Sequence, residues 1–177
     1  MKLSIIIPVY NEYQNINALH SKLITVILSL NYDYEIIYVD DGSKDNSQNL
    51  IEKNAELDNK IKLIVFKRNF GQTAALAAGI ENSTGDIIIT LDGDGQNAPE
   101  SIPDLLNKLN EGFDLVAGWR KKRNDGFFLR RFPSIIANKI ISIVTKVDIH
   151  DHGCTMKAVR REAIKDIALY GELHRFI

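Results

Sequence analysis

Apolar runs separated by polar stretches divide the first two-thirds of the chain into alternating strands and helices. Residues 3–9 form a continuous apolar run rich in β-branched side chains, which is typical of a strand buried in a parallel sheet. Similar runs predict further strands at 34–39, 61–66, 86–91 and 114–118, and another at 153–159. Helices are predicted at 71–82 and 99–110 and from about residue 161. Regular alternation of this kind predicts one α/β domain with a doubly wound, mostly parallel sheet and flanking helices.

Two polar residues are predicted to begin helices after the first two strands. Asn and Ser side chains commonly accept hydrogen bonds from the free N–H groups of a first helical turn. We therefore expect Asn11 to cap a helix that runs to about Leu30. Ser43 is expected to cap the next helix, which runs to about Leu57.

The composition and the missing motifs argue against several classes of protein. The chain has 177 residues and one cysteine, Cys154, which excludes an internal disulfide framework and a four-cysteine zinc site. No apolar stretch approaches the roughly 18 residues that span a bilayer, and nothing resembles a signal peptide. The first strand is not followed by Gly-x-Gly-x-x-Gly, and no phosphate-binding P-loop is present. These absences argue against dinucleotide oxidoreductases and nucleoside triphosphatases.

The charge is divided unevenly along the chain. Twelve of the 22 Lys and Arg residues but only four of the 23 Asp and Glu residues lie within 118–165, so this segment carries +8 and the remainder −9. Residues 120–131 form a basic loop, and 134–147 have the pattern of an amphipathic helix with Lys139 and Lys146 on its polar stripe. Such a segment suits an anionic partner or an anionic membrane surface, although the helix could instead pack on the domain's own core.

Candidate chemistry gathers where the predicted strands end, which is where open α/β sheets bind ligands. Asp92 and Asp94 follow a buried strand, and glycines at 93 and 95 let the chain bend so that both carboxylates reach one ion. Gln96 could add a third oxygen. Oxygen ligands favour Mg²⁺ or Mn²⁺. An acidic turn that only caps the next helix is the alternative, and the three other polar strand ends favour the metal site.

The other strand ends offer groups for a nucleotide. Asp40 and Asp41 could accept hydrogen bonds from a base and position a ribose, or could belong to a plain turn before a helix. A phosphoacceptor receiver domain is disfavoured because the third strand ends in Lys67 and Arg68 rather than an aspartate. Lys67, Arg68, Asn69 and Gly71 sit where cations and backbone amides could approach phosphate, unless the charges are merely solvated.

A cluster of residue types that bind zinc lies near the end of the basic segment, but its spacing does not indicate a zinc site. His150, Asp151, His152 and Cys154 match no tetrahedral zinc spacing, and no second ligand pair follows. We therefore expect Cys154 to be a small buried thiol.

These residues together resemble family-2 glycosyltransferases of the GT-A fold. The resemblance is strongest to the branch that transfers sugars to polyprenyl phosphates, which includes dolichyl-phosphate mannose synthases and undecaprenyl-phosphate glycosyltransferases. The matching blocks are Ile6-Ile7-Pro8-Val9-Tyr10-Asn11-Glu12, Asp40-Asp41-Gly42-Ser43, Arg68-Asn69-Phe70-Gly71, Asp92-Gly93-Asp94-Gly95-Gln96, Gly118-Trp119-Arg120, Asp151-His152-Gly153-Cys154 and Glu172-Leu173-His174-Arg175-Phe176. The Gln96 position and the last three blocks are specific to that branch.

The resemblance implies a role for each matched position. The nucleotide-sugar site would be formed by Pro8, Tyr10, Asn11, Glu12, Asp40, Asp41, Arg68, Gly71, Asp92 and Gly93. The metal ligands would be Asp92, Asp94 and Gln96. Arg120 and Arg131 would bind phosphates of donor or acceptor, and Ser134 would touch the acceptor phosphate. Asp94, Arg120, Arg131 and Asp151 would be the residues closest to catalysis.

The implied activity is inverting transfer of a sugar from a UDP- or GDP-linked donor to a polyprenyl phosphate at the cytoplasmic face of a membrane. Residues 1–118 would bind donor and metal, and 119–177 the acceptor and membrane. Relatives often continue into two transmembrane helices, so the chain is expected to be a truncated form. A second copy of the chain is a further candidate partner. The alternatives are a soluble family-2 enzyme acting on a carbohydrate hydroxyl, with Asp151 as the general base, and a catalytically inactive regulatory domain. A nucleic-acid-binding module is disfavoured because few aromatic residues accompany the basic ones.

Overall fold

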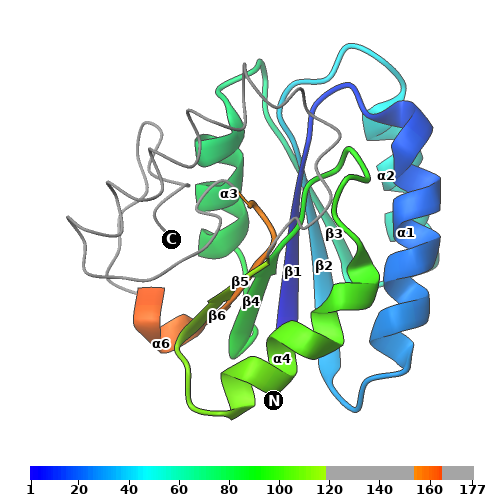
Figure 1. Ribbon diagram of the computed structural model, residues 1–177. Helices are drawn as coiled ribbons and strands as arrows, with labels where there is room; N and C mark the ends of the chain where they lie inside the picture. The colour runs from blue at the N-terminus through cyan, green and yellow to red at the C-terminus, as the bar shows by residue number, and fades with distance from the viewer. Residues whose placement is uncertain (119–153, 165–177) are drawn as a thin grey trace, which may run out of the picture.

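The computed structural model describes residues 1–118 and 154–164, and it shows the predicted alternation of strands and helices (Figure 1). In chain order the elements are β1 (Lys2–Val9), α1 (Tyr13–Leu28), β2 (Asp33–Asp40), α2 (Ser47–Leu57), β3 (Ile61–Val65), α3 (Gln72–Glu81), β4 (Ile87–Thr90), the 3₁₀ turn η1 (Pro99–Ser101), α4 (Ile102–Asn110), β5 (Leu115–Ala117), β6 (Lys157–Arg160) and α6 (Arg161–Ile164). The predicted basic loop at 120–131 and amphipathic helix at 134–147 lie outside the described residues.

The strands form one six-stranded sheet in the order β3-β2-β1-β4-β6-β5. β1 pairs in parallel with both β2 and β4, and β2 pairs in parallel with β3. β6 enters between β4 and β5 and runs antiparallel to both. The predicted mostly parallel sheet is therefore confirmed, with one reversed strand that returns the later part of the chain beside β4.

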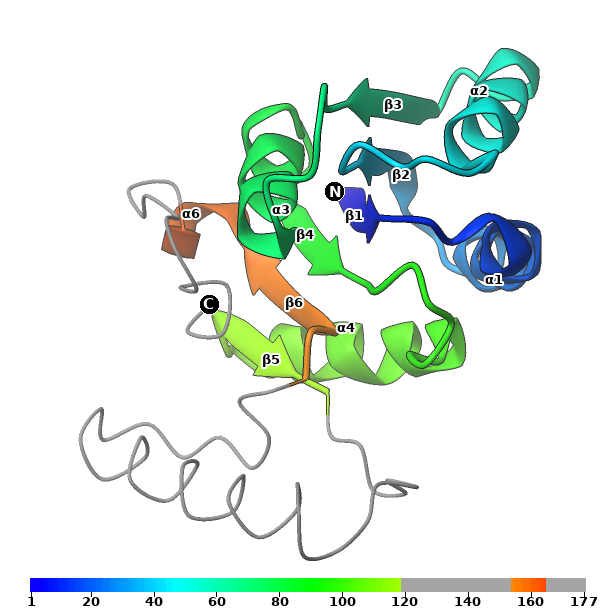
Figure 2. The same cartoon turned by 90° about the horizontal axis from the view of Figure 1, so that it is seen from above.

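Helices cover both faces of the sheet (Figure 2). Alternate side chains of β1 divide between the two faces, as the period of two in a strand requires. Leu3, Ile5 and Ile7 pack in a core with residues of α1, α2 and α4. Ile6 points the other way and packs with α3 and α6. Because β1 is buried on both faces, the loop that follows it starts from a tightly packed strand.

The two predicted helix caps are wrong. α1 begins after Glu12 and α2 after Asn46, and neither helix has a side-chain cap. Asn11 and Ser43 instead bond to one another's loops: the Asn11 N–H donates to Ser43 Oγ at 2.9 Å, and Asn11 Oδ1 accepts from the Lys44 N–H at 2.8 Å. These polar side chains therefore join the loops after β1 and β2. Within 1–118 and 154–164, no helix has the length and apolarity needed to cross a bilayer.

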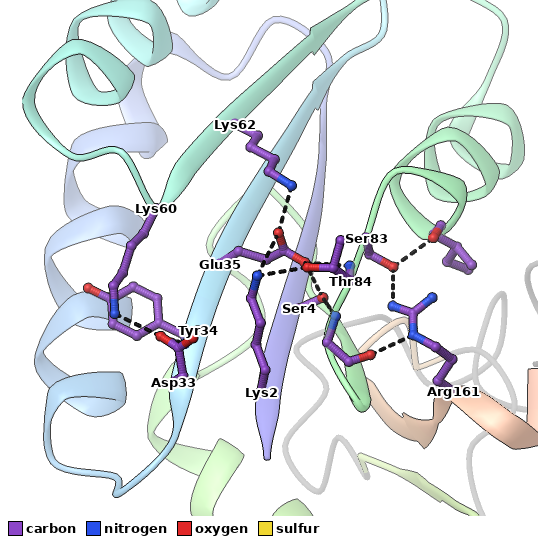
Figure 3. Close-up of polar contacts among 12 residues, drawn as sticks. Lys2, Ser4, Asp33, Tyr34, Glu35, Lys60, Lys62, Ser83, Thr84 and Arg161 are labelled. Atoms are coloured by element: carbon purple, nitrogen blue, oxygen red, sulfur yellow. Dashed lines mark hydrogen bonds and ion pairs between the residues drawn. The ribbon is translucent and has the colours of Figure 1, made fainter.

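A buried carboxylate ties together the amino ends of the strands, at the edge of the sheet opposite the loops just described (Figure 3). Glu35 on β2 is 2% exposed, and its Oε1 accepts from the hydroxyls of Ser4 at 2.6 Å and Thr84 at 2.9 Å. Lys62 Nζ lies 2.7 Å from Oε2, and Lys2 Nζ 3.3 Å from it. Burial alone would raise the pKa of Glu35, but these donors outweigh it and hold the pKa well below its ordinary value.

Because the folded protein depresses the pKa of Glu35, this carboxylate stabilises the fold above the ordinary Glu pKa of about 4.3 and loses that effect as pH falls below it. We expect Glu35→Gln to lower the free energy of unfolding at pH 7 by about 2 kcal/mol. The difference from the wild type should shrink as the pH is lowered below 4.3. Urea unfolding at several pH values measures both effects.

Glu111→Gln provides the control, because Glu111 also pairs with a lysine, Lys108 at 2.8 Å, but is 53% exposed. Exposed pairs contribute up to about 1 kcal/mol. Equal losses in the two variants would contradict the importance of the buried network.

Candidate active site

A cleft with a volume of about 330 Å³ opens where β1, β2 and β4 end. The chain runs from β1 outward to β2 and β3, and then returns to place β4 on the other side of β1. The strand order therefore reverses at β1, and open α/β sheets bind ligands at such a point, beyond the carboxyl ends of the strands. The lining residues are Pro8, Val9, Tyr10, Glu12, Asp41, Asn69, Gly71, Gln72, Asp92, Gly93 and Asp94.

Asp41 joins two sides of this cleft. Its Oδ1 accepts from the Phe70 N–H at 2.7 Å, and its Oδ2 accepts from the Gly71 N–H at 2.9 Å. Gly42 allows this contact, because a Cβ at that position would lie 2.5 Å from the backbone carbonyl carbon of Arg68. The loop before α3 is thereby fixed against the end of β2.

Asp40 occupies a different place from its neighbour. Its side chain is fully buried, and its Oδ2 accepts from the Ser43 N–H at 3.2 Å. Burial raises the pKa of this carboxyl, although the hydrogen bonds from Ser43 act in the opposite direction. Asp40 does not line the cleft, and its visible role is to shape the turn that presents Asp41.

Three side chains hold the carboxylate of Asp92. Gln72 Nε2 donates to Oδ1 at 2.8 Å, and Asn97 Nδ2 donates to Oδ2 at 3.1 Å. The Thr155 hydroxyl also donates to Oδ2. These donors come from three separate segments: the start of α3, the loop after β4, and the stretch before β6. Asp92 is therefore fixed by contacts from elements distant in sequence.

Asp94 also lines the cleft, and it is partly exposed. Its Oδ1 accepts from the Gln96 N–H at 2.9 Å. Gln96 itself is exposed and does not line the cleft. No group of three His, Cys, Asp or Glu side chains within the described part of the chain could hold an ion alone. An ion beside Asp92 and Asp94 would thus complete its shell with water and a bound ligand, as Mg²⁺ commonly does with substrate phosphates.

The cleft has a strongly acidic lining. Four carboxylates line it, those of Glu12, Asp41, Asp92 and Asp94, and no Lys or Arg is among the described residues that line it. Arg68 is exposed, and its guanidinium lies 4.5 Å from the ring centroid of Phe70. The amino end of α3 reaches the cleft at Gly71 and Gln72, and the helix dipole favours negative charge there.

The structure brings together most, but not all, of the predicted donor residues. Pro8, Tyr10, Glu12, Asp41, Gly71, Asp92, Gly93 and Asp94 line the cleft, whereas Asn11, Asp40, Arg68 and Gln96 do not. Arg120, Arg131, Ser134 and Asp151 lie outside the described residues. Cys154 is 2% exposed in the core, as expected of a buried thiol.

The sequence analysis missed Val9 and Gln72, which line the cleft, and also Asn97 and Thr155, which join Gln72 in holding Asp92. Asn69, which was named among the polar strand ends, lines the cleft as well. Thr155 could have been found only from the strand register. β4 and β6 pair antiparallel with Thr90 opposite Lys157, and extending this pairing by two residues sets Asp92 opposite Thr155. The apolar pattern predicts a strand there but not its partner.

Comparison with known proteins identifies the family. The model of "Glycosyl transferase family 2" matches residues 4–168. The chain belongs to this family. The predicted membership in family 2 is confirmed.

Two curated relatives are similar over the whole length of this family-2 chain. The dodecaprenyl-phosphate galacturonate synthase of Rhizobium johnstonii is 41% identical, over 100% of this chain and 53% of the relative. The undecaprenyl-phosphate 4-deoxy-4-formamido-L-arabinose transferase of Shewanella sediminis is 44% identical, over 99% of this chain and 53% of the relative. The chain thus spans about half the length of these relatives.

Solved structures confirm the GT-A fold of this family-2 chain. The crystal structure of glucosyl-3-phosphoglycerate synthase from Mycobacterium tuberculosis, in complex with Mn²⁺, UDP-glucose and phosphoglyceric acid, is similar with a TM-score of 0.71. The match covers 92% of this chain and 58% of that one at 20% identity. At this identity the similarity concerns the fold alone.

We expect Gly42→Ala to destabilise the protein by about 3 kcal/mol or more. The residue has φ of +72°, which costs an L residue about 1–2 kcal/mol, and its new Cβ would collide with the backbone at 68–69. Gly95→Ala is the matched control, because Gly95 has φ of +74° and open space around it, so only the backbone cost applies. Urea unfolding compares the two, and equal losses would contradict a tight contact between Gly42 and the loop before α3.

Proposed function

We propose that this chain is the catalytic domain of a metal-dependent glycosyltransferase that moves a sugar from a nucleoside-diphosphate donor to a polyprenyl phosphate. Residues 1–118 form the part that binds the donor, and 119–177 the part that binds the acceptor. Two relatives above 40% identity, both named for polyprenyl phosphates, support this acceptor class. The acidic cleft between β1 and β4 carries the argument for the donor.

A diphosphate is an anion, yet the described lining of the cleft offers it four carboxylates and no basic side chain. Coulomb repulsion would disfavour binding, and more strongly in a partly buried cleft than in water. A divalent cation between the carboxylates and the diphosphate reverses the sign of that interaction. The cleft therefore suits a nucleotide that binds together with a cation.

Asp92 and Asp94 are the residues that would hold this ion, with Gln96 as a further candidate ligand. Carboxylate oxygens are hard ligands, which fits Mg²⁺ or Mn²⁺ better than a softer metal. When bound, the ion would supply charge neutralisation for the leaving diphosphate. The solved structure of glucosyl-3-phosphoglycerate synthase with Mn²⁺ and UDP-glucose supports this class of ion and donor. Tyr10, Glu12 and Asp41 would then line the nucleoside end of the cleft.

The acceptor phosphate is the nucleophile in this proposal. Its second pKa is about 6, so it is largely a dianion at neutral pH and needs no strong base. A phosphate oxygen attacks the anomeric carbon from the face opposite the leaving group. The new bond between that oxygen and the anomeric carbon forms as the bond from the carbon to the diphosphate oxygen breaks. The nucleoside diphosphate leaves, and the configuration inverts. Arg120, Arg131 and Ser134 would position the phosphates, and Asp151 would orient the basic residues.

The acceptor is a lipid, so the reaction would take place at the cytoplasmic face of a membrane. The basic segment 118–165 carries +8, and such a segment is attracted to anionic lipids by about 1 kcal/mol for each cation near the surface. Association with the membrane surface is therefore part of the proposal.

The first test is nucleotide binding. We expect the chain to bind UDP or GDP in Mn²⁺, and binding to weaken greatly in EDTA. Asp94→Asn should reduce the Mn²⁺-dependent affinity by about 100-fold or more, because even outer-shell partners of a metal commonly contribute about 10–100-fold. Asp104→Asn, on α4 and away from the cleft, should bind like the wild type. Calorimetry measures all three, and metal-independent binding or none would contradict the proposal.

The second test concerns the acceptor. A panel of UDP- and GDP-linked sugars is incubated with a short polyprenyl phosphate or with oligosaccharides, and products are detected by mass spectrometry. We expect a glycosyl phosphate lipid from one donor and no oligosaccharide product, because a sugar hydroxyl requires a general base that a phosphate dianion does not. Transfer only to oligosaccharides would contradict the acceptor class while leaving the donor site intact.

A further inference from the structure

The carboxylate of Asp92 is held more elaborately than a metal ligand on a flexible turn would be. A carboxylate offers about four acceptor positions, and at least three on Asp92 are used by the side chains of Gln72, Asn97 and Thr155. Hydrogen bonds to an ionised group are stronger than neutral ones. Asp92 is therefore restricted to one orientation before any ligand is bound.

Two of the three donors, Asn97 and Thr155, are themselves held in place. Asn97 is 6% exposed, and its Nδ2 also donates to the Thr155 hydroxyl at 3.0 Å. The Thr155 hydroxyl thus accepts from Asn97 and donates to Asp92. The Thr155 carbonyl in turn accepts from the hydroxyl of Thr90, the last residue of β4. The arrangement forms a closed set of hydrogen bonds across the β4–β6 pairing.

We propose that Gln72, Asn97 and Thr155 are positioning residues that fix Asp92 for the donor-bound ion. This inference rests on the proposed function. Without these donors the Asp92 side chain would lose three of the contacts that fix its orientation, and binding of the ion would have to select that orientation. Thr155 is the member that matters most for the enzyme as a whole, because it belongs to the segment that returns from residues 119–153 to the sheet.

The test compares Thr155→Val with Thr155→Ser in the full 177-residue chain. Val keeps the shape and removes the hydroxyl, whereas Ser keeps the hydroxyl. Calorimetric titrations use UDP and GDP, each in saturating Mn²⁺ and in EDTA. We expect Thr155→Val to weaken Mn²⁺-dependent binding by about 10- to 100-fold, to leave any binding in EDTA unchanged, and Thr155→Ser to bind like the wild type.

Thr84→Val is the matched control. Thr84 also donates its hydroxyl to a buried carboxylate, that of Glu35 at 2.9 Å, but at the opposite edge of the sheet. It should lower the melting temperature without changing nucleotide binding. A purely structural role for Thr155 would give the same result as Thr84→Val.

A second pair keeps the inference testable if Thr155→Val does not fold. Gln72→Met removes the amide donor to Asp92 at the partly exposed start of α3, and Gln48→Met removes an equivalent bond to the exposed Glu52 at 2.7 Å on α2. Only Gln72→Met should weaken Mn²⁺-dependent binding.

Wild-type affinity in both Thr155→Val and Gln72→Met would overturn the inference alone. A wild-type chain without Mn²⁺-dependent nucleotide binding would overturn the proposed function, and the inference with it. Reduced binding in both variants, with Thr155→Ser and Gln48→Met normal, would support the positioning role.

Discussion

The parallel pairing of β1 with both β2 and β4 is the constraint on which the site depends. β1 is buried on both faces, so its register with its neighbours cannot slip without moving its apolar side chains into the wrong layer. That register brings Pro8, at the end of β1, into the same crevice as Asp41 and Asp92, which follow β2 and β4. Residues that are more than eighty positions apart in the sequence thus lie together at one edge of the sheet.

Concentrating carboxylates at that edge creates repulsion, and the fold offsets it with fixed hydrogen-bond donors. Asp41 receives two backbone N–H groups, and Asp92 receives three side-chain donors. Each donor orients a carboxylate without bringing a positive charge into the cleft, as a salt bridge would. At the opposite edge a buried carboxylate is held differently, because Glu35 forms an ion pair with Lys62.

The sequence was sufficient for the elements and for most of the cleft, because buried strands and their polar ends have a local signature. It failed where a contact depends on distant segments. Asn11 and Ser43 are residue types that often cap helices. Because β1 and β2 end side by side, these two side chains instead form hydrogen bonds between the loops that follow the two strands. Thr155 was missed because a strand's pattern does not reveal its direction or its neighbour. Gln72 was missed because a glutamine at the start of a helix is ordinary until β4 is placed beside it.

The chain leaves the sheet after β5 and rejoins it at β6, on either side of the basic residues 119–153. Residues 119–153 contain eight Lys and Arg against three Asp. The described residues on either side of this segment lie together, because the Gly118 N–H donates to the Met156 carbonyl at 2.8 Å. Thr155 directly precedes Met156, and its hydroxyl donates a hydrogen bond to Asp92. The described residues that flank the basic segment therefore lie beside Asp92. Under the proposed function, an anionic acceptor and an anionic donor held through a cation would meet there.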